Sequence, residues 1–531
     1  MSERKDTDDA GPLGEPAAVA QGGGVRPDLV KQGHGGTMAM ARDDQPDHPA
    51  AGGDDRAAGE HSRVGGHPAI NGNPGTDGNL DANGNPDADG NPGAEGDRAN
   101  GGGASSGLLA SGGDNVSGGE GRLRRQAAIA LAVLGVVILA VAAFSTPWRV
   151  LAAGPPDPAR DFSAAQIARA QAFDAATTLP SYLALALTVI IAALLVATPL
   201  GAKAVGRLRG PWWLRVILGV VVIAAATDLI RWPLGMWFET LLRDYGLSTQ
   251  DWAAWAGDRL KSMGVEAFLL CLSLLVLVGL ARKVRRWWIP AAAGAFALAV
   301  AASFVYPVVF EPLFNDFTSM REGPLRTNLL AMAERDGVPV EDVLVADASR
   351  RTTALNAYVS GFGATRRIVV YDTLLRAPQA EVELVVAHEL GHAKDDDVLY
   401  GTLIGGLGAA FGAILLFLLF GLVRRRAGVT SITDPRAVGA IMGLMSLGSL
   451  LMGPAQNLIS RHIEARADVH ALDLTRDPAT FIAMQKRLAT TNISDLSPDA
   501  VEYVLYASHP SSPERIALAR SWAKLNGVPE P

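Results

Sequence analysis

The chain has 531 residues, of which 49% are hydrophobic and 19% charged. This length allows two or three domains, but so apolar a composition is not that of an ordinary soluble protein. The net charge of −7 comes without a concentrated basic segment that could neutralise phosphates, so we expect no nucleic-acid partner. The single cysteine, Cys271, excludes an internal disulfide framework and a cysteine-cluster metal site.

The first 121 residues are rich in Gly, Ala, Asp, Asn and Pro and contain almost no aromatic or large aliphatic residues. Such a segment cannot bury a core, so the sequence predicts a disordered tail over 1–121. No apolar segment with a cleavage site lies near its start, so we expect no signal peptide.

Seven apolar runs follow the tail, and together they predict an α-helical multi-pass membrane protein. The third and seventh runs are the weaker predictions, because about 15 residues also suits a buried helix of a soluble protein. Tryptophans stand at the edges of several runs, where amphipathic rings favour the membrane interface. The runs are Ala127–Thr146, Tyr182–Leu200, Val216–Ile230, Val265–Leu280, Ile289–Val305, Gly401–Val423 and Ala437–Leu451.

A polar segment, 306–400, separates the fifth run from the sixth. It begins with a helix expected at Pro324–Asp336 and a strand expected at Asp342–Ala346. Asn356–Gly363 and Arg367–Tyr371 then read as the two arms of a hairpin. The sequence therefore predicts a short β-sheet, and an edge strand of such a sheet can pair with an extended peptide.

The motif His388-Glu389-Leu390-Gly391-His392 follows this sheet at the end of an apolar, helix-compatible run. Residues four apart lie on one face of a helix, so His388 and His392 can both bind one Zn²⁺. Glu389 then lies beside the metal, where a carboxylate can take a proton from the attacking water and pass it to the leaving amine. A chance match on an exposed helix is the alternative, at about one in a hundred for so few histidines. The motif predicts a zinc metalloprotease centre.

The third metal ligand has to come from another segment, because two histidines do not complete a zinc site. Glu464 and Asp468 are four apart in a helix-compatible stretch, hence on one face. Glu464 can bind the metal, while Asp468 can accept the outer N–H of a ligand histidine and fix its tautomer. His462 and His470 compete for the third position, although they point away from that face on a regular helix. An ordinary charged helix is the alternative interpretation.

His509 is the last histidine and sits in a turn that leads into a helix. A histidine brought to the metal could stabilise the oxyanion of a tetrahedral intermediate, where a peptidase needs positive charge or hydrogen-bond donors. Taken alone, His509 is more simply a turn residue.

In combination these motifs resemble the integral-membrane zinc peptidases that include CAAX prenyl protease 1 and, more distantly, the HtpX heat-shock proteases. The seven spans and the Asn-Ala-Tyr segment resemble CAAX prenyl protease 1 more closely, since HtpX-like enzymes have fewer spans. The resemblance rests on Tyr245–Gln250, Glu311–Phe317, Asn356-Ala357-Tyr358, His388–His392, Ser460–Asp468, and His509-Pro510 with Arg515.

The resemblance implies that one zinc ion per chain is bound by His388, His392 and Glu464, with Glu389 as general base. It also implies a mostly helical, zincin-like catalytic domain that contains a small β-sheet and lies beneath an intramembrane chamber ringed by about seven transmembrane helices. Prenylated substrates follow only by analogy.

The same resemblance assigns substrate contacts. It implies that Asn356, Ala357 and Tyr358 form a substrate-binding strand and that His509 and Arg515 line the active site. The expected division of the chain is a tail at 1–121, an N-terminal membrane domain of five helices at 122–305, a first catalytic segment at 306–400, a transmembrane hairpin at 401–452 and a second catalytic segment at 453–531.

We therefore expect a zinc endopeptidase, multi-pass in the cell membrane, that hydrolyses peptide bonds with a zinc-activated water. Its substrate would be a peptide or a membrane protein, lipidated or not. One alternative is an HtpX-like protease for membrane-protein quality control. Another is a non-catalytic scaffold stabilised by zinc, against which the intact Glu389 argues, because a scaffold does not need a general base.

The orientation in the membrane follows from the basic residues, which cluster at 122–125, 203–215, 282–286 and 424–426. Seven spans place all four clusters on one side, and the positive-inside rule assigns that side to the cytoplasm. The catalytic domain would then face outward. The resemblance implies the opposite, since CAAX prenyl protease 1 works on the cytosolic face, but the charges of this chain favour the outward orientation.

Overall fold

The computed structural model describes residues 111–361 and 363–531. Most of the predicted disordered tail therefore lies outside the described residues. Its last residues do not, because helix α1 runs from Ser111 to Ser145 and so begins inside the predicted tail. Once the apolar span has formed a helix, each further residue adds a hydrogen bond without a new nucleation cost, which explains the extension into a glycine-rich stretch.

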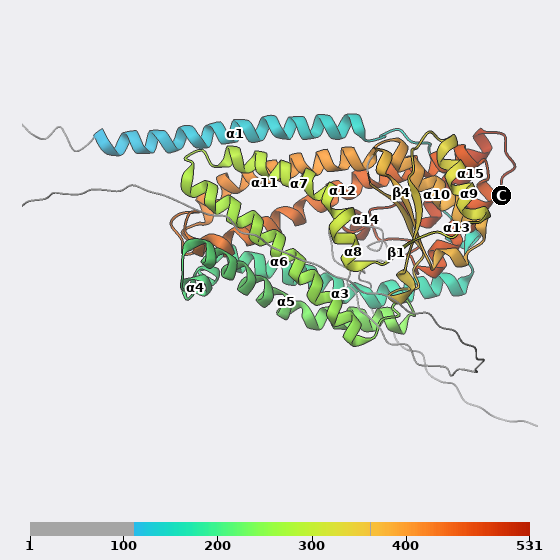
Figure 1. Ribbon diagram of the computed structural model, residues 1–531, viewed down its shortest axis with the longest axis horizontal. Helices are drawn as coiled ribbons and strands as arrows, with labels where there is room; N and C mark the ends of the chain where they lie inside the picture. The colour runs from blue at the N-terminus through green and yellow to red at the C-terminus, as the bar shows by residue number, and fades with distance from the viewer. Residues whose placement is uncertain (1–110, 362) are drawn as a thin grey trace, which may run out of the picture. The chain divides into compact units, whose positions relative to one another are not determined.

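Seven helices of the described residues are long and apolar enough to cross a membrane. The predicted seven-span membrane fold is thus confirmed, with the third and seventh spans included. Figure 1 shows most of these helices running roughly alongside one another. They are α1, α3 (Ala164–Ala197), α5 (Trp212–Asp244), α6 (Trp252–Lys283), α7 (Trp288–Val305) with the π-helical turn Tyr306–Phe310 and α8 (Glu311–Phe314), α11 (Asp397–Val423) and α12 (Val438–Thr475).

Two of these helices are much longer than the roughly 20 residues that a bilayer requires. Helix α3 has 34 residues, and the segment at its start packs through Phe162 and Ala170 on the catalytic core. Helix α12 has 38 residues and runs without a break across the expected domain boundary at 452/453. The membrane region and the catalytic region are therefore joined by continuous helices as well as by loops.

The predicted β-sheet has four strands in the order β1-β2-β4-β3. They are β1 (Phe317–Ser319), β2 (Asp342–Ala346), β3 (Ala357–Ser360) and β4 (Arg367–Tyr371). Strands β3 and β4 form the antiparallel hairpin that the sequence predicts, whereas β2 and β4 pair in parallel. This order leaves β3 at one edge of the sheet.

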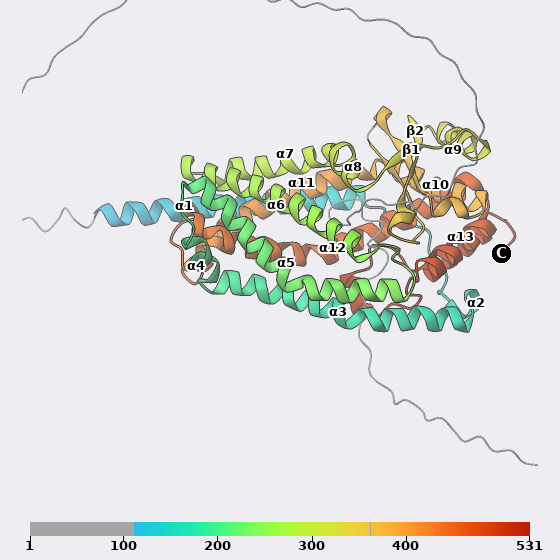
Figure 2. The same cartoon turned by 60° about the horizontal axis from the view of Figure 1, so that its bottom comes forward.

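One face of the sheet packs on α9 (Pro324–Arg335) and α10 (Gln379–Lys394), through buried residues such as Val343, Ile368 and Val386. The same core takes in residues from the second polar segment, among them Phe481 and Trp522. These belong to α13 (Pro478–Thr491) and α15 (Ser512–Leu525). Sheet and helices lie together at one end of the long helices, so that 306–400 and 453–531 build one catalytic body (Figures 1 and 2).

Candidate metal centre

The centre lies where α10 meets the second half of α12. His388 and His392, one turn apart on α10, direct their Nε2 atoms to the same point, 3.2 Å from each other. Glu464 of α12 completes the group, with Oε2 3.1 Å from Nε2 of His388 and Oε1 3.6 Å from Nε2 of His392. Ligand atoms about 2.0–2.1 Å from a tetrahedral metal are roughly 3.3 Å from one another, so this spacing suits a metal ion.

A glycine in the motif lets the two helices come this close. A Cβ atom at Gly391 would lie 3.0 Å from Cδ2 of His470 on α12, tighter than ordinary side-chain contacts. Any larger residue would require the ring of His470 to shift by a few tenths of an ångström. The glycine therefore favours the close approach of α12 that brings Glu464 to the two imidazoles.

Each histidine is held from behind by a carboxylate. Nδ1 of His388 lies 2.9 Å from Oδ1 of Asp468, and Nδ1 of His392 lies 3.0 Å from Oδ2 of Asp397. A proton on each Nδ1 leaves each Nε2 with a free lone pair, which is the tautomer that a metal ligand needs. Asp468 thus lies where the helical spacing predicts an orienting carboxylate.

Arg515 lies behind this group rather than in an open cleft. Its Nε donates to Oδ2 of Asp468 at 2.8 Å, and its Nη2 lies 3.3 Å from Nδ1 of His388. Burial disfavours the charge of Arg515, but Asp468 outweighs this and raises the pKa of the guanidinium. The geometry therefore favours a role in orienting Asp468 over the expected contact with substrate.

The carboxylates around His392 favour the protonated form of its imidazole. Burial lowers the pKa of its imidazole, but the nearby Glu464 and Asp397 outweigh burial and raise it to about 9. A metal ion has to displace that proton from the ring. Metal binding is consequently coupled to proton release.

Glu389 and His509 are the remaining two residues that the sequence assigns to the site. Glu389 is buried on α10, next to the first histidine. His509 comes from the turn before α15, where the Ser511 capping box with Glu514 fixes the start of the helix. Its Nε2 lies 3.0 Å from Oε1 of Glu464, so the turn brings the ring to the metal ligands.

The two competing histidines lie elsewhere. Nδ1 of His462 is 2.9 Å from the carbonyl oxygen of Leu458, and its ring packs against Trp148. Nε2 of His470 is 2.8 Å from Oδ2 of Asp336. Neither ring faces His388, as the helical spacing predicts.

The expected substrate strand is the edge strand β3, next to α10. The side chains of Asn356 and Ala357 are buried. The ring of Tyr358 lies on the face of the sheet opposite to α10, with its centroid 6.4 Å from that of the Tyr371 ring. The strand therefore offers its backbone edge to a ligand rather than these side chains.

Asp397 and its partner Arg466 also belong to the site, although the sequence did not predict them. Asp396 has a left-handed φ of 52° and forms the turn between α10 and α11. This turn directs the side chain of Asp397 back to His392. Arg466 of α12 pairs with Asp397 and, at 2.8 Å, with Asp395. The run of three aspartates directly after the motif was the available signal.

Two family models and several known proteins match this chain. Residues 319–523 match the family model for peptidase family M48, and residues 148–316 match the model for the CAAX prenyl protease N-terminal region with five membrane helices. The chain is 30% identical over 324 residues to the uncharacterized metalloprotease YhfN of Bacillus subtilis, a match that covers 60% of this chain and 75% of that protein.

Eukaryotic relatives match over part of the chain, and a solved structure shares its fold. A CAAX prenyl protease 1 homolog of Oryza sativa is 34% identical, over 42% of this chain and 53% of that protein. CAAX prenyl protease 1 of Saccharomyces cerevisiae is 26% identical, over 56% of this chain and 70% of that protein. The crystal structure of S. mikatae Ste24p has the same fold, with a TM-score of 0.60 at 20% identity over 75% of this chain and 98% of that one. The chain therefore belongs to peptidase family M48, as a membrane metalloendopeptidase homologous to CAAX prenyl protease 1.

Proposed function

We propose that the metal is zinc, one ion per chain, bound by His388, His392 and Glu464. Two imidazole nitrogens and a carboxylate are the ligand set of many catalytic zinc sites, which keep one further position open. The proposal rests on the convergence of these three side chains: the two Nε2 atoms are 3.2 Å apart, and the carboxylate of Glu464 places Oε2 3.1 Å from the first and Oε1 3.6 Å from the second. Asp468 and Asp397, behind the two rings, add the outer carboxylates that such sites use.

Each residue of the site has a different role in the proposed reaction. A bound zinc ion supplies Lewis acidity that lowers the pKa of water to about 7. Glu389 takes the proton of the attacking water and delivers it to the leaving amine. His509, beside Glu464, donates a hydrogen bond to the oxygen that gains negative charge. Arg515 and Asp468 keep His388 in place.

The substrate is a peptide that extends along the free edge of β3. Main-chain pairing of this kind supplies affinity that does not depend on sequence. The relatives named CAAX prenyl protease 1 suggest a prenylated C-terminal segment as the preferred substrate of this chain too. The membrane would be the cell membrane, with the catalytic end directed outward according to the basic clusters.

The test compares a prenylated peptide with its unmodified twin. Purified, zinc-loaded protein is incubated with both, and the products are mapped by mass spectrometry next to the Glu389→Gln variant. We expect one main cut, faster in the prenylated peptide and lost in the variant. Equal cleavage of both peptides would point to the broad specificity of a quality-control protease. Cleavage that survives in Glu389→Gln would refute the assignment of the general base.

A further inference from the structure

The backbone of β3 directs its polar groups alternately to β4 and to the open edge. Asn356 accepts a hydrogen bond from the backbone N–H of Tyr371 at 3.0 Å, and the register pairs Tyr358 with Val369. In an antiparallel ladder every second residue bonds the partner strand, and the residues between them face away. Leu355, Ala357 and Val359 therefore turn their N–H and C=O groups to the open edge.

The first of these three positions is already occupied. The backbone N–H of Leu355 donates to Oδ1 of Asn492 at 2.9 Å, and Nδ2 of Asn492 donates to the carbonyl oxygen of Leu355 at 3.2 Å. One side-chain amide thus makes both bonds that a neighbouring strand would make at this point. Asn492 imitates one peptide group of a paired strand.

The turn that aims Asn492 is held in an unusual conformation. Asn492 follows the C-terminus of α13, and the next residue, Ile493, has a left-handed φ of 51°, which is rare for a β-branched side chain. Ile493 is buried against Phe173 of α3 and Leu247. Strain of this kind persists where the surroundings enforce it, commonly at functional sites.

From this geometry we propose that Asn492 is a positioning residue that sets the register of the substrate. It closes the edge of β3 at Leu355, so that a substrate strand can pair only with Ala357 and Val359. The peptide then reaches the metal centre in a single register and is cut at a single bond. This inference rests on the proposed binding of substrate along β3.

The test is a change of cut position. In Asn492→Ala the edge at Leu355 opens, and a substrate can slide by two residues, the repeat of a β-strand. We expect a second major product whose end lies two residues from the normal cut. Asn492→Asp keeps the acceptor for the N–H of Leu355 but loses the donor to its carbonyl oxygen, so it should give the second product in a smaller share than Asn492→Ala.

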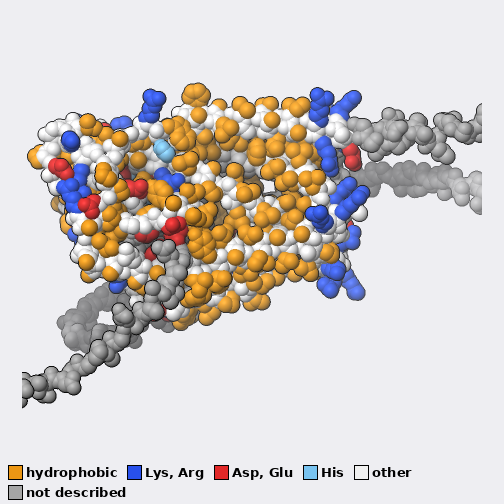
Figure 3. Space-filling view, turned by 180° about the vertical axis from the view of Figure 1, so that it is seen from behind, with side chains coloured by type: hydrophobic (Ala, Val, Ile, Leu, Met, Phe, Trp, Pro, Cys, Tyr) orange, Lys and Arg blue, Asp and Glu red, His pale blue; other side chains and the backbone are white. Residues whose placement is uncertain are grey.

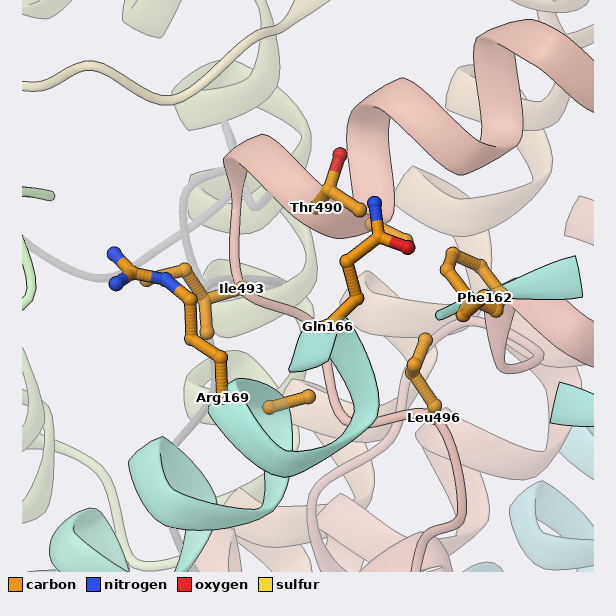
Figure 4. A pocket seen from close by; sticks show the side chains of 8 residues that line it. Phe162, Gln166, Arg169, Thr490, Ile493 and Leu496 are labelled. Atoms are coloured by element: carbon orange, nitrogen blue, oxygen red, sulfur yellow. The ribbon is translucent and has the colours of Figure 1, made fainter. Parts of the chain in front are cut away.

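A matched control separates this effect from a loosened turn. Thr490 lies two residues before Asn492 and lines, with Ile493 and with Gln166 of α3, a small cavity of about 80 Å³ behind the turn (Figure 4). Thr490→Ala removes the hydroxyl that donates to the carbonyl oxygens of Lys486 and Arg487 in the last turn of α13, just before Asn492. It does not touch Leu355 and should leave the cut position unchanged.

The outcomes distinguish the register from the function itself. If wild-type protein cuts no peptide, the proposed function fails. If Asn492→Ala cuts only the normal bond, whether faster or slower than wild type, the proposed register role is wrong but the proposed peptidase function is not affected.

A second experiment uses peptides that each carry one N-methylated amide, incubated with wild-type protein. Cleavage should be lost when the methyl group is at alternate positions next to the cut, since every second N–H of a paired strand faces β3.

Discussion

The two histidines of the centre are oriented by carboxylates of different origin. Asp468 lies on α12, one turn after Glu464, and so comes with the third ligand. Asp397 is the first residue of the membrane-spanning helix α11 and is fixed by Arg466 of α12. Both histidines are therefore oriented by residues of membrane-spanning helices, His392 by the first residue of α11 and His388 by the polar second half of α12.

Substitution of Glu389 and Glu464 should separate the base from the ligand. Glu389→Gln removes the proton acceptor but no metal ligand, so we expect bound zinc to remain near one per chain while hydrolysis falls by roughly 10²–10⁴-fold. Glu464→Ala should lose both. Metal analysis of the purified variants together with peptide turnover measures the difference. A Glu464→Ala protein with stoichiometric zinc would show that the third ligand is a different residue.

Asp397→Asn should weaken the metal site without removing a ligand. The amide holds a proton on Nδ1 of His392 less well than the carboxylate does, and loss of such an outer partner costs about 10–100-fold in metal affinity. Competition with a chromophoric chelator gives the zinc affinity directly. Asp395→Asn is the matched control, because Asp395 also pairs with Arg466 but does not contact His392. Equal affinities in the two variants would contradict the role of Asp397.

At the scale of elements, hydropathy and helical spacing predict most of what the structure contains. They give the seven spans, the strand pair β3–β4 and the shared face of His388, His392 and Glu389. They do not give the length of α12, whose polar second half is stabilised by packing on α10 rather than by the membrane. The parallel pairing of β2 with β4 is not predicted either, because the pattern of a short apolar strand does not reveal which strand it pairs with. The role of Asp397 could not be predicted either, since it depends on the conformation of the turn at Asp396.

The contact between α2 (Pro158–Asp161) and the C-terminal helices has a defined pH dependence. Asp161 is buried and binds Arg520 at 2.5 and 2.9 Å and Lys486 at 3.2 Å. Burial alone would raise the pKa of this carboxyl, but Arg520 and Lys486 hold it below its ordinary value. The carboxylate therefore stabilises the fold above the unfolded pKa of about 3.9, and this contribution is lost as the pH falls through the lower folded pKa.

Asp161→Asn should accordingly lower the melting temperature at pH 7 and have less effect as the pH falls below about 4. Removing one partner of a buried pair costs on the order of 3 kcal/mol. Glu530→Gln is the control, because the exposed Glu530 pairs with Arg160 and, more loosely at 3.9 Å, with Arg520, and such surface pairs contribute about 1 kcal/mol or less. A melting curve of Asp161→Asn that matches wild type at pH 7 would contradict this account.

At the scale of the whole described chain, the four basic clusters and the metal centre lie at opposite ends of the long helices. The Nη1 of Arg282 donates to the carbonyl oxygen of Thr433, Arg124 lies against Gly421, and α4 (Leu200–Gly206) packs on the turn Pro435–Ala437. Figure 3 shows the Lys and Arg side chains gathered at that end. From Val438, beside this group, to Glu464 helix α12 covers about 39 Å, more than the roughly 30 Å of the hydrocarbon core.

Because the two ends lie on opposite sides of the membrane, only two orientations are possible, with the catalytic end either outside or in the cytoplasm. The ends differ in charge, since the Lys and Arg side chains at the catalytic end are interspersed with Asp and Glu (Figure 3). The positive-inside rule counts Lys and Arg near the ends of the spans and assigns the richer side to the cytoplasm. The expected result is a metal centre on the outer side of the cell membrane. The relatives named CAAX prenyl protease 1 act on prenylated proteins according to their name, and a cytosolic substrate of that class would need the opposite orientation.

Single cysteines on a background without Cys271 decide between the two. Ser319 is exposed on β1 at the catalytic end, and Thr430 is exposed in the loop between α11 and α12 at the basic end. In a Cys271→Ala chain, Ser319→Cys should react with a membrane-impermeant maleimide added to intact cells, whereas Thr430→Cys should react only after the membrane is permeabilised. The reverse pattern would place the catalytic end in the cytoplasm. It would then follow that the orientation of this fold is set by something other than the four basic clusters.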